Sequence, residues 1–138
     1  MTVLTIIGIL SLVAIVYMLM MLFDDYTYKN YNYEFFQWNS FIIMAGSYLS
    51  IFIGKDMYVK ALANNGDILN GQLLIIFGAI ALIYVFIINI KNTNLLVGTF
   101  GSIFQFTIYA VLTVISFFAL LVIVLFLSQT KPVYVINK

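Results

Sequence analysis

One stripe of polar side chains in the C-terminal part of the chain is the arrangement best suited to form a polar site. Its members are spaced three and four residues apart, which places them on one face of an α-helix. They are Ser102, Gln105, Tyr109, Thr113 and Ser116. In an apolar helix such a stripe either lines a water-filled path or hydrogen-bonds to a neighbouring helix, and we favour the second use. Gln105 is the costliest member to leave unpaired, because its amide offers both donors and an acceptor.

A second pattern consists of small residues in the stretch 35–54. Gly46, Ser50 and Gly54 follow one another at four-residue spacing and share one helix face. In lipid no hydrophobic force drives helices together, so small residues that let backbones approach closely favour association. The stripe predicts a packing face, used either between subunits or inside one chain. Weaker versions of the pattern occur at Gly8 with Ser11 and at Gly78 with Ala81.

Four charged residues between the second and third apolar stretches form a candidate docking surface. They are Lys55, Asp56, Lys60 and Asp67. Asp56 and Lys60 have the i,i+4 spacing that stabilises a helix. The sequence Asn64-Asn65-Gly66 predicts that this helix stops there, with Gly66 in the left-handed conformation. Asp67 is then placed to cap the next helix, so the two stretches predict an αα-hairpin with a short charged tip.

The residue types that are missing exclude several classes of chemistry. The chain has no Cys, no His and no Arg, and its net charge is +1. Disulfides, thiolate nucleophiles, imidazole acid–base catalysis and the usual transition-metal sites are therefore excluded. The low charge also lacks the basic footprint of a nucleic-acid-binding protein. We predict that the chain is not an enzyme and has no catalytic residue, no cofactor, no bound metal and no nucleic-acid partner.

The composition indicates that lipid surrounds most of the chain. Of its 138 residues 64% are hydrophobic and 8% are charged, and the mean hydropathy is +1.13. A soluble domain is about half apolar and about a quarter charged, and a globule of this size cannot hide so much apolar surface. A membrane-spanning helix needs about 20 apolar residues. The stretches that qualify are 3–23, 35–54, 68–90 and 102–128.

These stretches predict an all-α integral membrane protein, in which four transmembrane helices form a small bundle with short loops in a single domain, 1–138. The stretch 3–23 has no basic segment before it and no small-residue cleavage site before Asp24, so we expect a transmembrane helix rather than a signal peptide. Gly98 and Gly101 are expected to interrupt the approach to the fourth helix, which Ser102 would cap.

Charged and aromatic residues gather at the ends of the predicted spans. No charged residue falls in the middle of a span, which argues against a proton-coupled transporter, because such proteins need buried relay groups. Asp24 and Asp25 alone lack the third ligand that a magnesium site needs. Asn89 and the polar residues after it could bind a lipid headgroup or a partner. The aromatic group of Tyr26, Tyr28, Tyr31, Tyr33, Phe35, Phe36 and Trp38 is expected to form an interfacial belt or, alternatively, a recognition surface.

Lysine distribution predicts the topology. With an even number of spans both termini lie on one side of the membrane, together with the hairpin tip. That side would hold Lys55, Lys60, Lys131 and Lys138, whereas Lys29 and Lys91 would lie on the other. The positive-inside rule then predicts cytoplasmic termini. The bias toward Ile, Phe, Tyr, Asn and Lys without Arg suggests an AT-rich bacterial genome, and hence the bacterial inner membrane.

Two functional hypotheses follow. The first is a non-catalytic membrane protein that forms homo-oligomers or joins a membrane complex, and that acts as an anchor, scaffold or sensor subunit signalling to a cytoplasmic protein partner. Architecture alone suggests a bacterial antiviral defence or immunity system as its setting. The alternative is an oligomeric channel or pore lined by the polar stripe from Ser102 to Ser116.

Overall fold

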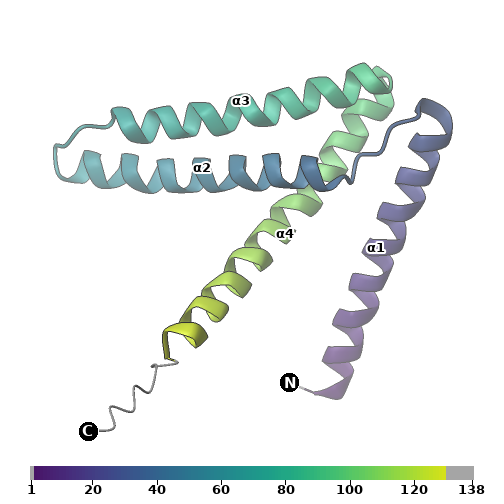
Figure 1. The fold of residues 1–138 in the computed structure, drawn as a ribbon, viewed down its shortest axis with the longest axis horizontal. Coiled ribbons are helices and arrows are strands. Elements are labelled where there is room, and N and C mark those ends of the chain that lie inside the picture. The colour runs from purple at the N-terminus through teal and green to yellow at the C-terminus, as the bar shows by residue number, and fades with distance from the viewer. Residues whose placement is uncertain (1, 130–138) are drawn as a thin grey trace, which may run out of the picture.

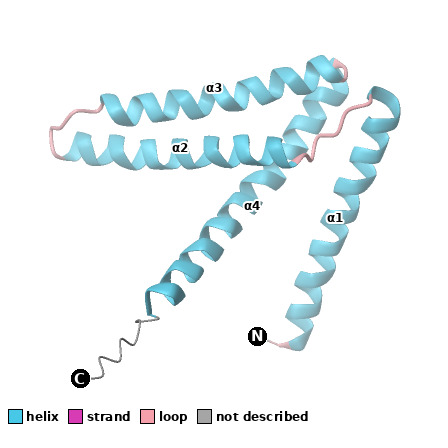
Figure 2. Cartoon of the chain, in the orientation of Figure 1, coloured by secondary structure: helices cyan, strands magenta, loops and turns pink. Residues whose placement is uncertain are grey.

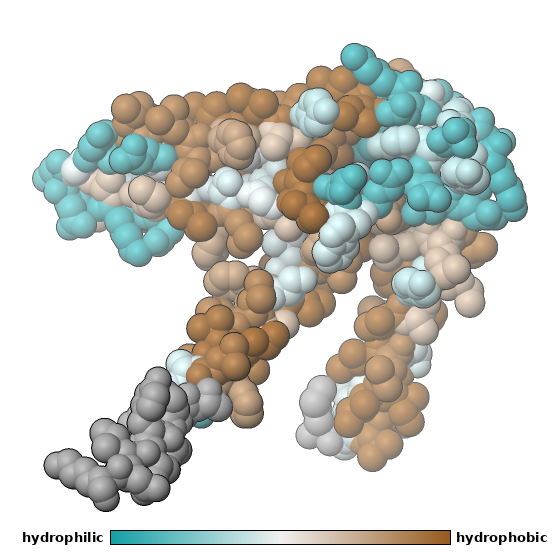
Figure 3. Space-filling model, viewed as in Figure 1, coloured by the Kyte–Doolittle hydropathy of each residue, from teal (hydrophilic) through white to brown (hydrophobic). Residues whose placement is uncertain are grey.

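The computed structural model describes residues 2–129, and within this range the chain forms four α-helices and no strand (Figure 1, Figure 2). They are α1 (Val3–Tyr31), α2 (Trp38–Ala63), α3 (Leu69–Asn92) and α4 (Leu95–Gln129). All four helices are long and apolar enough to cross a membrane, which agrees with a multi-pass membrane protein. Figure 3 shows hydrophilic residues gathered at the tip of the α2–α3 hairpin and where the four helices meet, with apolar surface between them.

Helices α2 and α3 form the predicted hairpin, with a small correction at its tip. The left-handed residue is Asn65, with φ of 51°, and not Gly66. The Gly66 N–H donates to the Ala61 carbonyl at 2.8 Å, which is the bond that closes a Schellman turn. Asparagine tolerates this conformation better than most residues. The N-cap position of α3 is Ile68 and not Asp67 as predicted, but the Asp67 carboxylate accepts a hydrogen bond from the N–H of Leu69, the first residue of the helix, at 2.9 Å.

The two hairpin helices pack along a seam of small residues that recur every seven positions. Ser47 and Gly54 of α2 lie opposite Gly78 and Gly71 of α3. A Cβ atom added to Gly78 would lie 2.6 Å from the Ser47 carbonyl oxygen, and one on Gly71 would lie 2.8 Å from the Gly54 carbonyl oxygen. A seven-residue repeat is typical of left-handed helix pairing. This seam makes α2 and α3 the most extensively packed pair of helices.

Helix α4 begins earlier than the sequence predicts. It starts at Leu95, where the Asn94 side chain accepts a hydrogen bond from the Val97 N–H at 2.8 Å and caps the helix. The prediction that Ser102 caps this helix was therefore wrong. Ser102 lies inside the helix and is buried.

Gly98 and Gly101 do not interrupt α4, which corrects a further prediction. Both lie inside the helix, where their small size matters. A Cβ atom on Gly98 would lie 2.6 Å from the Ile90 Cα atom, and one on Gly101 would lie 2.5 Å from the Phe35 ring. The two glycines thus let α4 approach the end of α3 and the loop 32–37 closely.

The bundle is closed at one end and open at the other. Helix α1 and the C-terminal half of α4 leave the α2–α3 hairpin obliquely (Figure 1). The most apolar part of α1 contains no buried residue. In α4 every residue from 114 to 129 is exposed. The predicted small bundle is therefore a packed region of α2, α3 and the first half of α4, from which two apolar helical segments diverge.

Candidate functional site

A buried hydrogen-bond network joins α3, α4 and the loop 32–37 where the helices meet. Asn89 of α3 lies at its centre, and its Nδ2 donates to Ser102 Oγ and to Gln105 Oε1, each at 2.8 Å. Its Oδ1 accepts a hydrogen bond from the Tyr33 hydroxyl at 2.7 Å. Asn89, Ser102 and Gln105 are all fully or almost fully buried. We call Tyr33, Asn89, Ser102 and Gln105 the polar junction.

Gln105 connects the polar junction to the backbone of the loop. Its Nε2 donates to the Phe35 carbonyl oxygen, so both ends of its amide are occupied. Among residues 2–129, no buried side-chain nitrogen or oxygen lacks a hydrogen-bond partner. A buried polar group that loses its partner costs about 1–3 kcal/mol. The complete pairing therefore stabilises this one arrangement of helix ends over others.

Asp24 connects the loop 32–37 to α1 through hydrogen bonds. Its carboxylate accepts hydrogen bonds from the backbone N–H groups of Phe35, at 2.8 Å, and Phe36, at 3.2 Å. Helix α1 continues past Asp24 to Tyr31, so this half-buried carboxylate lies within the helix. The adjacent Asp25 is exposed and pairs with Lys29 at 2.7 Å. The two acids that look alike in the sequence thus have different partners.

Tyr33 is the donor in its bond to Asn89, and its surroundings keep it protonated. Burial, and after it the nearby negative charge of Asp24, raises the pKa of the Tyr33 phenol above its ordinary value of 10.0. At neutral pH the phenol is therefore uncharged and carries the proton that it donates to the Asn89 side-chain oxygen.

Aromatic rings surround the polar junction. The Phe23 ring of α1 lies 5.0 Å from that of Phe35 and 5.8 Å from that of Phe104, and Phe36 lies 5.6 Å from Tyr109. These pairs are edge-to-face, the arrangement that aromatic quadrupoles favour. Part of the aromatic group expected at the interface is thus internal. Its exposed members include Tyr26, Tyr28 and Trp38.

The polar stripe of α4 is mostly occupied inside the chain. Ser102 and Gln105 belong to the polar junction, and the Tyr109 hydroxyl donates to the Gln37 carbonyl at 3.1 Å. The Thr113 hydroxyl donates to the carbonyl of Tyr109 at 2.7 Å, and Ser116 is exposed. Four of the five predicted residues therefore hydrogen-bond to the loop 32–37, to α3 or to the backbone of α4.

The small-residue stripe of α2 is divided between two environments. Gly54 is buried against α3, Ser50 is half-buried, and Gly46 is exposed with no atom within 4 Å of an added Cβ atom. The interface follows the seven-residue spacing of Ser47 and Gly54 and not the four-residue spacing that we singled out. Ser47 was missed, although small residues at every seventh position in both hairpin helices could have indicated it.

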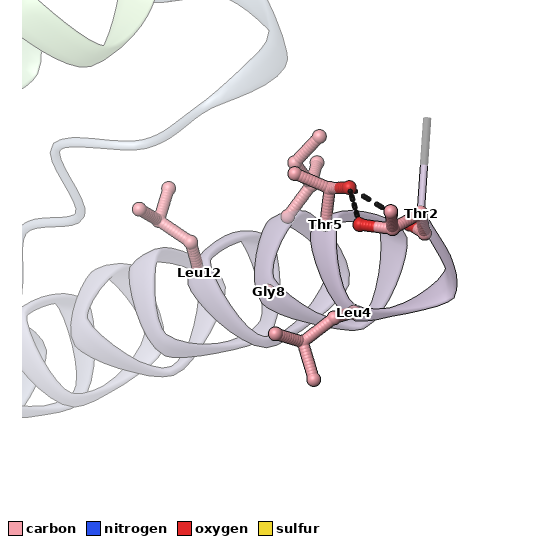
Figure 4. A pocket seen from close by; sticks show the side chains of 6 residues that line it. Thr2, Leu4, Thr5, Gly8 and Leu12 are labelled. Atoms are coloured by element: carbon pink, nitrogen blue, oxygen red, sulfur yellow. Dashed lines mark hydrogen bonds between the residues drawn. The ribbon is translucent and has the colours of Figure 1, made fainter.

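Gly8 in α1 resembles Gly46, since no atom of the described residues outside its own turn of helix lies within 4 Å of its added Cβ atom. It lies in a shallow hollow with Thr2, Thr5 and Leu12, where the two threonine hydroxyls are 2.8 Å apart (Figure 4). By contrast, an added Cβ atom would come closer than 3.0 Å to a neighbour at every other glycine within a helix. Those glycines are Gly54, Gly71, Gly78, Gly98 and Gly101.

The charged residues of the hairpin tip are all exposed. Lys60 forms an i,i+4 ion pair with Asp56 at 2.6 Å, and Lys55 directly precedes Asp56 on α2. Such surface pairs contribute little to stability, with a typical value of about 0.5 kcal/mol. The Asp67 carboxylate accepts the hydrogen bond from the Leu69 N–H. The tip is thus accessible to the polar phase.

Neither a metal-binding cluster nor a known relative assists the assignment. In the part of the chain that the structure describes, no three His, Cys, Asp or Glu residues are grouped to hold a metal ion. Lys131 and Lys138, on which the predicted topology partly depends, lie outside the described residues. No protein-family model, no curated protein and no solved structure matches the chain.

Proposed function

We propose that the chain is a non-catalytic membrane subunit that assembles with copies of itself and serves as an anchor, scaffold or sensor. The observation that carries this proposal is the open space at Gly8 and Gly46. A glycine within a helix costs about 1 kcal/mol relative to alanine, and the five other helical glycines offset this by allowing close contacts. Among residues 2–129 nothing makes such use of Gly8 and Gly46, so we assign these faces to a helix of another copy.

The surroundings of Gly8 support the same assignment. The hollow beside it is lined by Thr2, Thr5, Leu4, Ile9 and Leu12, and none of the other helices that the structure describes contributes to it (Figure 4). Threonine hydroxyls at a helix–helix contact in lipid can form hydrogen bonds across it. Glycine for close approach and threonine for hydrogen bonding are the residue types that membrane helix interfaces favour.

The test is the mass of the purified particle. Gly8→Leu and Gly46→Leu, alone and together, should lower the oligomeric state measured by light scattering in detergent and by subunit energy transfer in liposomes. Ala14→Leu is the matched control, because it adds the same side chain to another exposed face of α1. A wild-type monomer, or a double variant of unchanged mass, would overturn the proposal. Gly54 is unsuitable as a target because it belongs to the α2–α3 seam.

The hairpin tip is the proposed contact for a cytoplasmic partner. Its four charged residues are Lys55, Asp56, Lys60 and Asp67. Charge reversal at Lys55 and Lys60 together should abolish binding of such a partner without altering the α2–α3 seam, because both lysine side chains are exposed and the seam is formed by the buried face of α2. A role in bacterial antiviral defence stays a prediction from architecture.

The contacts of α4 favour this proposal over a channel. Its polar stripe would have to face a water-filled pore, yet Ser102, Gln105, Tyr109 and Thr113 hydrogen-bond to groups of their own chain. We therefore expect no current from the purified protein in planar bilayers. A conductance that Gln105→Leu alters would favour the channel instead.

A further inference from the structure

The region around the tip of the α2–α3 hairpin contains two Asn-Gly pairs, in which a side chain can react with its own backbone. One pair is Asn65-Gly66 in the turn, and the other is Asn70-Gly71 in the first turn of α3. In such a pair the backbone nitrogen of the glycine can attack the side-chain amide carbon of the asparagine. Glycine leaves this nitrogen accessible because it has no Cβ atom. The two pairs have the same composition, so their structural surroundings decide which one reacts.

The surroundings of Asn65 leave this reaction open. Asn65 and Gly66 are both exposed, and the hairpin tip presents hydrophilic surface, where water is at hand (Figure 3). The Asn65 side chain makes no hydrogen bond within residues 2–129, so it is free to turn toward the Gly66 nitrogen. That nitrogen donates one hydrogen bond, to the Ala61 carbonyl at 2.8 Å. Opening an exposed turn of this kind costs little free energy.

The surroundings of Asn70 prevent the same reaction. Asn70 is the second residue of α3, and Gly71 is buried in the seam, where an added Cβ atom would lie 2.7 Å from the backbone nitrogen of Tyr58. The reaction closes a five-membered ring across the Asn-Gly peptide, and the dihedral angles of a helix hold the side-chain carbon away from that nitrogen. Asn70 can therefore react only after the start of α3 has separated from α2.

We propose that Asn65 is a site of spontaneous deamidation, which adds a negative charge to the hairpin tip. The Gly66 nitrogen attacks Asn65 Cγ and forms an N–Cγ bond. The Cγ–Nδ2 bond then breaks, and ammonia leaves with the proton that the Gly66 nitrogen has lost. Water opens the resulting ring at either carbonyl, which gives aspartate or isoaspartate at position 65. The step needs no enzyme, metal or oxidant.

The two products change the charge and the shape of the tip. Its four charged residues are two lysines and two aspartates, so a new carboxylate makes the tip negative overall. Aspartate tolerates the left-handed conformation that Asn65 has. Isoaspartate lengthens the backbone by one carbon and so disturbs the hydrogen bond from Gly66 to Ala61. The site lies within the proposed docking surface, but the reaction depends neither on a partner nor on self-assembly.

Peptide mapping of the purified chain, aged in lipid nanodiscs at mildly alkaline pH, tests the proposal. Trypsin cleaves after Lys60 and Lys91, so one peptide, 61–91, contains both Asn-Gly pairs, and its fragmentation spectra locate the new acid. Asn65 should convert at least about tenfold faster than Asn70, because an exposed turn opens more readily than a packed helix. In a digest aged in guanidinium chloride, where neither pair is folded, the two should convert at similar rates.

Gly66→Ala isolates the chemical step. Its added Cβ atom makes only ordinary contacts of 3.7 Å or more, all with Ala61, so the turn is kept while the methyl group shields the attacking nitrogen. Conversion at Asn65 should fall several-fold, and the rate at Asn70 should stay the same. An intact Asn65 in the folded chain, equal rates at the two pairs in nanodiscs, or an unchanged rate in Gly66→Ala would each overturn the proposal. No partner is present in these experiments, so their outcome is independent of the assembly and docking proposals.

Discussion

The two ends of the molecule are held together to very different extents. One end contains the polar junction, and at the other end α1 and the C-terminal half of α4 extend away from the α2–α3 hairpin. At the junction, buried amides, a carboxylate and edge-to-face rings hold three helices and a loop together. At the other end, leucine, isoleucine, valine and phenylalanine side chains are exposed along α1 and the C-terminal half of α4. In lipid an apolar side chain gains little by leaving its surroundings for another helix, so only hydrogen bonds and close packing join helices.

The α2–α3 hairpin supports this interpretation. It remains paired along its whole length, away from the junction as well as near it, and what distinguishes it from α1 is the seam of small residues. Close backbone approach thus joins the two helices of the hairpin, whereas hydrogen bonds join the helices at the junction.

The largest expected effect comes from filling the seam. Gly78→Ala should lower the free energy of unfolding by about 3 kcal/mol, the upper end for overpacking, because the new Cβ atom meets the backbone oxygen of Ser47. Gly66→Ala is the control, because an added Cβ atom there would make only ordinary contacts of 3.7 Å or more, and it should change stability by no more than about 0.5 kcal/mol. Reversible unfolding in mixed micelles, followed by circular dichroism, measures both. Equal losses for the two variants would mean that the seam is not where the helices meet.

A smaller effect is expected when the loop is released from α1. Asp24→Ala removes the acceptor of two backbone N–H groups and should cost about 2 kcal/mol, as for hydrogen bonds to a charged group. Asp25→Ala breaks only the exposed pair with Lys29 and should cost about 0.5 kcal/mol or less. The same unfolding assay compares them. If the two neighbours behave alike, Asp24 does not anchor the loop.

The smallest effect is expected in the diverging segments. Leu121→Ala in α4 should change the free energy of unfolding by no more than about 0.5 kcal/mol, because the side chain is exposed. This variant is best measured in lipid bilayers as well as in micelles. A loss above about 2 kcal/mol in bilayers alone would indicate that another helix packs on this segment there.

The number of helices could be predicted from the sequence, whereas their arrangement could not. Charge-free stretches bounded by Asp24, Lys55, Asp67 and Lys91 mark the spans directly, because a charge inside hydrocarbon is costly. The faces that pack leave a weaker signal, since a membrane helix is apolar all round and shows no hydrophobic periodicity. Grouping Gly46 with Gly54 was reasonable from spacing alone, yet the seam follows Ser47.

The contacts of the polar junction, like the packing faces, could not be predicted from the sequence alone. The sequence places Ser102 and Gln105 on one helix stripe and Asn89 at the end of a span, but their pairing depends on how α3 and α4 cross. Gly98 and Gly101 make that crossing possible, and in the sequence they resemble a break between helices. The role of Asp24 was hidden because its partners are backbone N–H groups, which no side-chain pattern reveals.

The most direct test of the account is a double-mutant cycle between Asn89 and Gln105, whose amides hydrogen-bond at 2.8 Å. Asn89→Leu and Gln105→Leu should each lower the free energy of unfolding by about 2 kcal/mol, since each leaves buried polar partners unpaired. Together they should cost less than the sum of the two by about 1 kcal/mol, which is the size of coupling expected for a buried interhelical hydrogen bond. Strictly additive losses would contradict the claim that hydrogen bonds at the junction hold the helix ends together.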